Sequence, residues 1–436
     1  MNKKNLILFL LLLFPAMALA QHRVEGIVTD AETGEPLPSA NILVKGTYTG
    51  TITNNDGRFL LSLDALPATL LVRYIGYQSE EIEVKEGMSG PLSVELQPSV
   101  VEMDEIVVTD KDPGLTIMEL VIERKKLWRA KLESFKADAY TRQKLENDTS
   151  IVSIAESVSE LFWDKDEGHR EVIKSRNQTS NIAEDQNFAG VNYIPNFYDD
   201  NIEIAGFNLV GVTHPDALKF YDFKLLEITK MDEKEVYKIE VIPKRTLQPL
   251  FEGAVYVLDE EYALLEVDLK PNRVVNFPPP VQDFKLAYRQ QFNNFGAEFW
   301  LPVDMRVSGD IRISMIGLRF PNIRFSQVAT ISDYEVNTEL PDSLFKDEDV
   351  FRVDSLSAKN DTLLSVRRVE KIPLTDDEEE AYAEIDSTQT LEKAFRPSGF
   401  LADAVMDDDE EEENGSSFLS GAGEFIPDGF GVDIHF

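Results

Sequence analysis

Cysteine is absent from the 436 residues of this chain, and only 4 histidines are present. Without cysteine there is no disulfide framework, no thiol nucleophile, no cysteine-based zinc site and no lipoprotein anchor. Basic residues are also scarce: 43 lysines and arginines face 79 acidic residues, and the formal net charge is −36. So negative a chain repels phosphate backbones, and we therefore expect no nucleic-acid partner.

Motifs for catalysis and for metal or cofactor binding are missing as well. The histidines (His22, His169, His214 and His435) form no His-Glu-x-x-His or paired-histidine spacing, which disfavours a zinc hydrolase. Ser343 and Lys346 match Ser-x-x-Lys, but they lie in a charged segment without the companion motifs. There is no glycine-rich phosphate loop. We therefore expect no catalytic residue, no cofactor, no metal and no enzyme activity.

The first twenty residues have the pattern of a secretory signal. Lys3 and Lys4 precede an unbroken apolar run, Leu6–Phe14, and Ala18–Ala20 is a small-x-small cleavage site. The apolar run is shorter than the ~20 residues that a membrane-spanning helix needs. We expect residues 1–20 to be removed and the mature protein to be exported without a helical anchor.

Residues 21–98 have the pattern of short strands separated by turns. Apolar and polar residues alternate from Val24 to Val28, and Asn54–Gly57 is a strong hairpin signal ahead of a strand at Arg58–Leu63. The asparagine and glycine residues there favour a turn over a calcium loop, because the ligand series is incomplete. About seven such strands without helical periodicity predict a small antiparallel β-sandwich.

Short motifs in this region resemble the carboxypeptidase-regulatory-like domain, a transthyretin-like sandwich. They are Gly26-x-Val28-x-Asp30, Thr33-Gly34-x-Pro36-Leu37, Ala40-Asn41-Ile42, Lys45-Gly46-Thr47, Gly50-Thr51 and Asp56-Gly57-x-Phe59. Tyr74–Tyr77 and Asp104–Thr109 resemble the version fused to exported envelope proteins, including TonB-dependent receptors. The resemblance implies a spacer or contact module rather than an activity, since this domain lacks the peptidase zinc site in the family.

A polar linker at residues 99–112 separates the sandwich from a second domain, expected at 113–337. Pro113 stands just ahead of an amphipathic helix at about Leu115–Leu132. Because domain boundaries fall in polar linkers that few contacts cross, we expect the two domains to fold independently. The helix carries a basic cluster that we interpret as a solvated face: Lys125, Lys126, Arg129 and Lys131.

Strands dominate the rest of the second domain. Segments such as Val236–Val241 have one apolar and one polar face, which favours a curved antiparallel sheet. Residues 176–218 interrupt the alternation and are predicted to form a long loop. Since one helix of about 18 residues spans only about 27 Å, we expect it to leave an apolar cavity over the sheet. Phe299 and Trp300 are the candidates for lining that cavity, with a place in the core as the alternative.

Two further resemblances concern this domain. The strand–turn–strand run Gly253–Asp268 resembles the hairpins of lipoprotein-carrier folds, in which a half-open barrel wraps a helix and an apolar cavity. Residues 22–400 as a whole resemble a family of unknown function in exported, outer-membrane-associated proteins. That resemblance rests on Phe135–Tyr140, Trp300–Pro302 and Ile372–Thr375. Family members typically continue into a membrane β-barrel, so this chain is expected to be a short or truncated member.

Residues 338–436 are expected to form an acidic, largely disordered tail. Two acidic runs, Asp376–Glu380 and Asp407–Glu413, lie among serine, glycine and proline residues. At the end of the chain, Phe430–Phe436 alternates apolar and polar residues, which is typical of an outer-membrane strand. A chance pattern in a flexible tail is the alternative.

The predicted fold class is therefore mainly β: a small N-terminal β-sandwich, then a helix plus a curved antiparallel sheet of lipoprotein-carrier type, and an acidic disordered tail. The leading hypothesis is a non-enzymatic cell-envelope protein on the periplasmic face of the outer membrane. Its expected partners are an envelope protein for the sandwich, an apolar ligand or lipid for the second domain, and the outer membrane. Two alternatives stay open: the N-terminal part of an outer-membrane transporter, and an exported hydrolase with an accessory sandwich.

Overall fold

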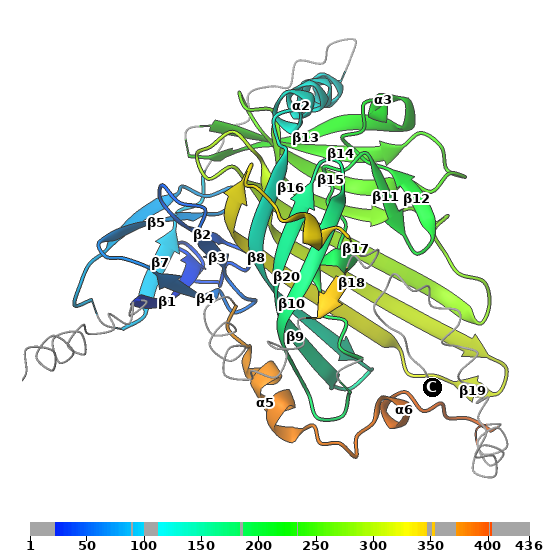
Figure 1. Cartoon of the computed structure of the whole chain (residues 1–436). Coiled ribbons are helices and arrows are strands. Elements are labelled where there is room, and N and C mark those ends of the chain that lie inside the picture. Colours follow the sequence, from blue (N-terminus) through cyan, green and yellow to red (C-terminus); the bar gives the residue numbers. More distant parts are fainter. Residues whose placement is uncertain are drawn as a thin grey trace, which may run out of the picture.

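The computed structural model describes residues 22–88, 90–99, 112–183, 186–232, 234–346, 351–353, 372–400 and 402. The chain forms a small two-sheet domain, one long helix and a large curved sheet (Figure 1). The predicted mainly β fold class is confirmed. The predicted signal at 1–20, the acidic run at 407–413 and the terminal pattern at 430–436 lie outside the described residues.

The N-terminal sandwich pairs a three-stranded sheet, in the order β4-β1-β7, with a four-stranded sheet, in the order β3-β2-β5-β6. Six strands pair antiparallel with a neighbour, as predicted, but β7 runs parallel to β1. The reason is that the chain crosses from β6 in one sheet to β7 in the other, so no hairpin fixes the direction. The strands are β1 (His22–Asp30), β2 (Asn41–Val44), β3 (Gly50–Ile52), β4 (Arg58–Leu63), β5 (Ala68–Arg73), β6 (Glu80–Val84) and β7 (Leu92–Leu96).

The predicted turn at Asn54–Gly57 is present, but it joins the two sheets instead of forming a hairpin within one. The Asn54 side chain accepts hydrogen bonds from the backbone N–H groups of Asp56 (3.0 Å) and Arg58 (2.9 Å), which reverses the chain. Gly57 has a φ of +71°, and a Cβ there would lie 2.5 Å from the Val28 carbonyl oxygen, so only glycine fits.

Helix α2 (Pro113–Arg129) opens the second domain close to its predicted position. Its N-cap is Asp112, whose Oδ1 accepts a hydrogen bond from the Gly114 N–H at 2.9 Å. The same oxygen accepts the Leu225 N–H at 2.9 Å, which ties the start of the helix to a strand of the large sheet. No helix in the described part of the chain is long and apolar enough to span a membrane.

The large sheet has 12 strands in the order β13-β14-β15-β16-β17-β18-β20-β8-β9-β10-β21, with β19 paired to β18. All neighbours are antiparallel except β10 and β21. The strands are β8 (Ser134–Glu146), β9 (Ile151–Asp164), β10 (Gly168–Gln178), β13 (Tyr221–Met231), β14 (Lys234–Pro243), β15 (Phe251–Leu258), β16 (Ala263–Pro271), β17 (Val281–Asn293), β18 (Leu301–Met315), β19 (Leu318–Arg319), β20 (Ile323–Val336) and β21 (Phe351–Val353).

The apolar face of this sheet is covered by α2 together with residues 191–212. That second segment includes the hairpin of β11 (Asn201–Ile204) and β12 (Phe207–Val210), and Phe197 and Tyr198 are buried in the shared core. The sequence predicted that the helix is too short to cover this face and leaves an apolar cavity there. Residues of the segment 191–212, which was predicted as part of a long loop, pack in the same core as α2 and extend the cover.

The opposite face carries the sandwich and residues 372–400. Along β18, Met305 and Val307 enter the core beneath α2, whereas Arg306 on the other face donates to the Thr53 carbonyl of the sandwich at 3.5 Å. Residues 372–400 contain α5 (Asp376–Glu384) and α6 (Leu391–Ala394). The remaining short helices are α3 (Ala217–Phe220) and the 3-10 turns Val191–Tyr193 and Asp342–Leu344.

The predicted disorder of Asp376–Glu380 was wrong. Thr375 and Glu378 form a capping box that starts α5, and Glu378 is only 5% exposed. Its carboxylate pairs with Arg142 of β8, which is itself buried. An acidic sequence folds here because the sheet beneath it presents a buried positive charge.

We propose that the sandwich folds without the rest of the chain, because its core cluster is separate from the core beneath α2. A fragment of residues 22–99 should unfold in one cooperative thermal transition, measured by circular dichroism. Leu70→Asp, at a fully buried position, should abolish the transition, while Met88→Asp, at a position 51% exposed, should preserve it. An unstructured wild-type fragment would show that the sandwich depends on its neighbour.

Candidate functional site

A cavity of about 690 Å³ lies where the sandwich meets the large sheet. Strands β2 and β5 form the sandwich wall, and the ends of β15 and β17 with the loop 293–300 form the other wall. Much of the lining is apolar: Leu43, Leu71, Leu258, Leu265, Phe292 and Trp300. The cavity therefore lies on the sandwich side of the second domain, away from α2.

Strand register explains why the sandwich wall is half apolar and half polar. Leu43 of β2 lies opposite Leu71 of β5, and Asn41 lies opposite Arg73 two residues further along. Asn41 Nδ2 donates to Gln291 Oε1 of β17 at 3.0 Å, and Arg73 pairs with Asp232 at 3.5 Å. Asn41 Oδ1 and Arg73 Nε are buried and have no hydrogen-bond partner within the described residues. This wall thus keeps unused hydrogen-bonding groups beside an apolar surface.

The loop 293–300 is held in place by contacts with both domains. Phe295 packs its ring 5.2 Å from that of Tyr48 in the sandwich, and Glu298 forms an ion pair with Lys131 after α2. These contacts position Trp300, which is buried and lines the cavity. Phe299 is half-buried and packs against the same core to which Trp300 belongs, but it does not line the cavity. The structure thus separates the two residues that the sequence predicted together.

The basic cluster on α2 is only partly solvated, which corrects its interpretation. Lys125 is 7% exposed, and its Nζ donates to Asp200 Oδ1 at 2.5 Å. Arg129 pairs with Asp199 at 3.2 Å and lies over the Trp163 ring at 4.5 Å. Burial lowers the pKa of the Lys125 amine, against the effect of Asp200. The exposed members of the predicted cluster are Lys126 and Lys131. Two of the four cations therefore hold the segment 191–212 against the helix.

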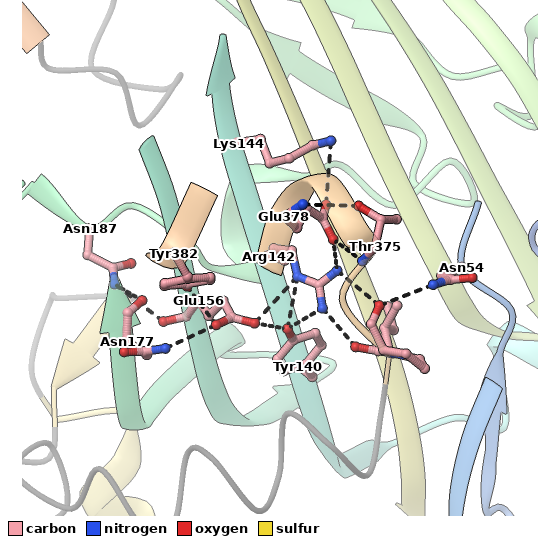
Figure 2. A network of polar contacts seen from close by, with 12 residues as sticks. Asn54, Tyr140, Arg142, Lys144, Glu156, Asn177, Asn187, Thr375, Glu378 and Tyr382 are labelled. Carbon is pink, nitrogen blue, oxygen red and sulfur yellow. Dashed lines mark hydrogen bonds and ion pairs between the residues drawn. The ribbon is translucent and has the colours of Figure 1, made fainter. Parts of the chain in front are cut away.

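A buried polar network lies on the same face as the sandwich (Figure 2). Arg142 is at its centre: Nη1 donates to Glu378 Oε2 at 2.7 Å and Nη2 donates to the Ile372 carbonyl at 2.7 Å. Arg142 also pairs with Glu156 of β9 at 3.4 Å. Although burial opposes the charge, the oxygens of Tyr140, Glu378 and Glu156 raise the pKa of Arg142.

Two tyrosine hydroxyls donate hydrogen bonds to the Glu156 carboxylate. Tyr140 donates to one carboxylate oxygen, and Tyr382 of α5 donates to the other at 2.7 Å. Burial, followed by the charge of Glu156, raises the pKa of Tyr382 far above its usual range, so the phenol remains a donor. The network therefore binds residues 372–400 to β8 and β9 through charges that are all matched.

Within the described residues, no group of three or more histidine, aspartate or glutamate side chains is arranged to hold a metal ion. His22 lies on β1, His169 on β10 and His214 in the loop before α3. His435 lies outside the described residues.

Comparisons with known proteins match both domains. Residues 24–108 match the CarboxypepD_reg-like domain, and residues 143–334 match a family of unknown function (DUF5686). The chain is therefore similar to these two families in successive segments. The predicted resemblances to the regulatory-like domain and to a family of unknown function are thereby confirmed.

The curated relatives share only a short stretch with this chain. TonB-dependent receptor P3 of Formosa agariphila is 39% identical over 106 residues, which is 24% of this chain and 10% of the receptor. TonB-dependent receptor SusC of Bacteroides thetaiotaomicron is 44% identical over 88 residues, 20% of this chain and 8% of the receptor. The chain therefore spans a tenth or less of the length of these two relatives.

One similar solved structure is a putative outer membrane lipoprotein-sorting protein domain from Vibrio parahaemolyticus. The similarity covers 53% of this chain and 96% of that domain, at 13% identity and a TM-score of 0.24.

Sequence reasoning missed the Arg142 network and the folded segment 372–400. A usable signal was present: Thr375 and Glu378 have the spacing of a capping box, which marks a helix start. The partner of that helix is more than 230 residues earlier in the chain. Only the fold shows that Arg142 lies beneath it.

Removal of the buried cation should be far more costly than removal of an exposed one. Arg142→Met leaves Glu156 buried without a cation and leaves Glu378 with Lys144 alone, at 3.4 Å, so the free energy of unfolding should fall by about 3–5 kcal/mol. Arg58→Met is the matched control, because Arg58 pairs with Asp376 of the same helix α5 but is 51% exposed. Its cost should stay below about 1 kcal/mol. Urea unfolding followed by circular dichroism measures both, and equal losses would contradict this account of the network.

Proposed function

We propose that this protein is a non-enzymatic component of the cell envelope that holds a ligand between its two domains. The ligand has an apolar body and a polar group. The observation that carries the proposal is the cavity of about 690 Å³ at the domain junction. Small-molecule sites typically measure about 300–1,000 Å³ and occur preferentially at domain interfaces.

The lining of the cavity favours an amphipathic ligand. Leu71 and Trp300 offer apolar surface from opposite walls. Asn41 and Arg73 offer one buried acceptor and one buried donor that no described residue uses. Because unused buried polar atoms are costly, a ligand group that pairs with them adds affinity as well as orientation.

Location in the envelope belongs to the same proposal. It is supported by the signal-like first twenty residues and by the similarity to proteins named as TonB-dependent receptors. We place the protein on the periplasmic face of the outer membrane, where a ligand with an apolar body is available. The CarboxypepD_reg-like domain serves as a contact module, and it already makes one such contact: Thr49 Oγ1 donates to Asp333 of the DUF5686 domain at 2.8 Å.

A second candidate function is that of a front end for an outer-membrane receptor or transporter. The similarity of the first domain to the two receptors favours it. In that role the sandwich would bind a receptor chain, and the cavity would need no ligand. Ligand binding by the purified protein therefore separates the two candidates.

Filling the cavity tests the leading proposal. The mature protein should bind a dansyl-labelled fatty acid saturably, and Leu71→Trp should weaken binding by about tenfold or more because the indole occupies the site. Leu226→Trp is the control: Leu226 is 42% exposed on β13 and does not line the cavity. Fluorescence titration measures the affinity. Equal binding by wild type and Leu71→Trp, or no saturable binding, would refute the proposal.

Adjacent aromatic residues give a second matched pair. Trp300→Ala removes part of the cavity wall and should weaken the probe's binding, whereas Phe299→Ala alters only the core contact. The thermal stability of both variants should be recorded, because each loses apolar contacts. A larger loss of affinity for Phe299→Ala than for Trp300→Ala would place the ligand elsewhere.

A further inference from the structure

A second, separate cavity of about 310 Å³ adjoins the Arg142 network. Three distant parts of the chain enclose it: the Asn54–Asn55 turn of the sandwich, strands β8, β16, β17, β18 and β20, and residues 372–378. Most of the side chains that line it end in an amide, a hydroxyl or a charged group, although carbon atoms make up much of the lining surface.

Positive charge prevails among the side chains that line this cavity. Four are cationic (Arg142, Lys144, Arg289 and Arg306) and two are carboxylates (Asp268 and Glu378). Arg142 and Arg306 also have carboxylate partners just outside the lining, Glu156 and the buried Asp304, so the less firmly paired cations are Lys144 and Arg289. The whole chain, in contrast, has a formal net charge of −36. A concave site lined by one sign of charge attracts small ions of the other sign.

Two of these cations are only loosely paired. Lys144 Nζ lies 3.4 Å from Glu378 Oε1, and Arg289 lies 3.4 Å from Asp268 and 3.5 Å from Glu266. Charge-assisted hydrogen bonds are usually about 2.7–2.9 Å long, so these contacts leave the donors able to bind another anion. Burial, the largest effect, raises the pKa of Glu266, against the effects of Gln291 and Arg289.

One anion already occupies the inner corner of the cavity. The Glu378 carboxylate lies between Arg142, at 2.7 Å, and Lys144, at 3.4 Å (Figure 2). Glu378 is supplied by a helix from the far end of the chain, not by the sheet that carries both cations. The position of a carboxylate between two cations thus shows which chemical group the corner accepts.

We propose that this cavity is a binding site for a small molecule that carries a phosphate or carboxylate group, and that Glu378 is its internal competitor. The anionic group of the ligand takes up the donors of Lys144 and Arg289. Asn54, Asn55, Ser308 and Ser326 then contact the rest of the ligand. Because Asn54 belongs to the sandwich and Glu378 to the segment 372–400, the ligand bridges all three enclosing parts.

Calorimetric titration of the complete mature chain with inorganic phosphate, at constant ionic strength, tests the proposal. Wild type should bind saturably. Arg289→Gln should weaken binding by about tenfold, the usual effect of losing one hydrogen bond to a charged group. The Arg289 side chain is 43% exposed, so this variant should fold. Glu378→Gln should tighten binding, because it removes the competing charge.

Asp376→Asn is the control for the second variant. Asp376 is on the same helix and is also acidic, but it is 85% exposed and does not line the cavity, so phosphate affinity should not change. A parallel titration with dihexanoyl phosphatidic acid distinguishes a lipid headgroup from a free phosphate as the source. Tighter binding of that lipid indicates the former, and equal or weaker binding the latter.

Three results would overturn the proposal. They are the absence of saturable phosphate binding by wild type at millimolar concentration, an affinity unchanged in Arg289→Gln, and a folded Glu378→Gln variant that binds no more tightly than Asp376→Asn. Circular dichroism of each variant establishes that it is folded before titration.

Discussion

The burial of one guanidinium group, that of Arg142, determines how the outer face of the large sheet is built. A charge removed from water needs compensating partners, and Arg142 is only 3% exposed. Glu156 of β9 provides one partner, but the other, Glu378, comes from the C-terminal segment. An otherwise acidic and polar sequence is thereby folded against β8 and β9. The sheet in turn gains cover over a region that the sandwich does not reach.

The inner face of the sheet is covered mainly through apolar contacts and not through a buried charge. Apolar side chains drive the packing there, yet α2 is too short to cover all of them, and the segment 191–212 completes the layer with Phe197 and Tyr198. Charged pairs then fix the position of that segment, since Lys125 and Arg129 bind consecutive aspartates, Asp200 and Asp199. The cover of the inner face thus depends on apolar packing for its stability and on two ion pairs for the position of the segment 191–212 relative to α2.

Local sequence patterns predicted the helix and the strands well, because alternation with a period of two and turn-forming residues depend only on neighbours within a few positions along the chain. The sandwich strands, the helix after Pro113 and most strands of the sheet follow from them. Contacts between distant residues were not accessible in this way. Gly309, for example, lies within β18, where a Cβ would lie 2.1 Å from the Phe325 ring of the neighbouring strand. Trp300 lines the cavity from the second domain, but the wall opposite it belongs to the other domain.

Asp112 has a consequence for how molecules of this protein behave beside one another. Among the strands that the structure describes, β13 ends the order of the large sheet, so one side of it has no neighbouring strand there. Such an edge exposes N–H groups that a strand from another molecule can capture, which leads to aggregation. The Asp112 carboxylate accepts the Leu225 N–H in the middle of β13, and the packing of Gly114 against Lys224 and Leu225 brings the helix start over the same spot. By occupying this N–H group, the N-cap of α2 also hinders a strand of another molecule from pairing with the edge of the sheet.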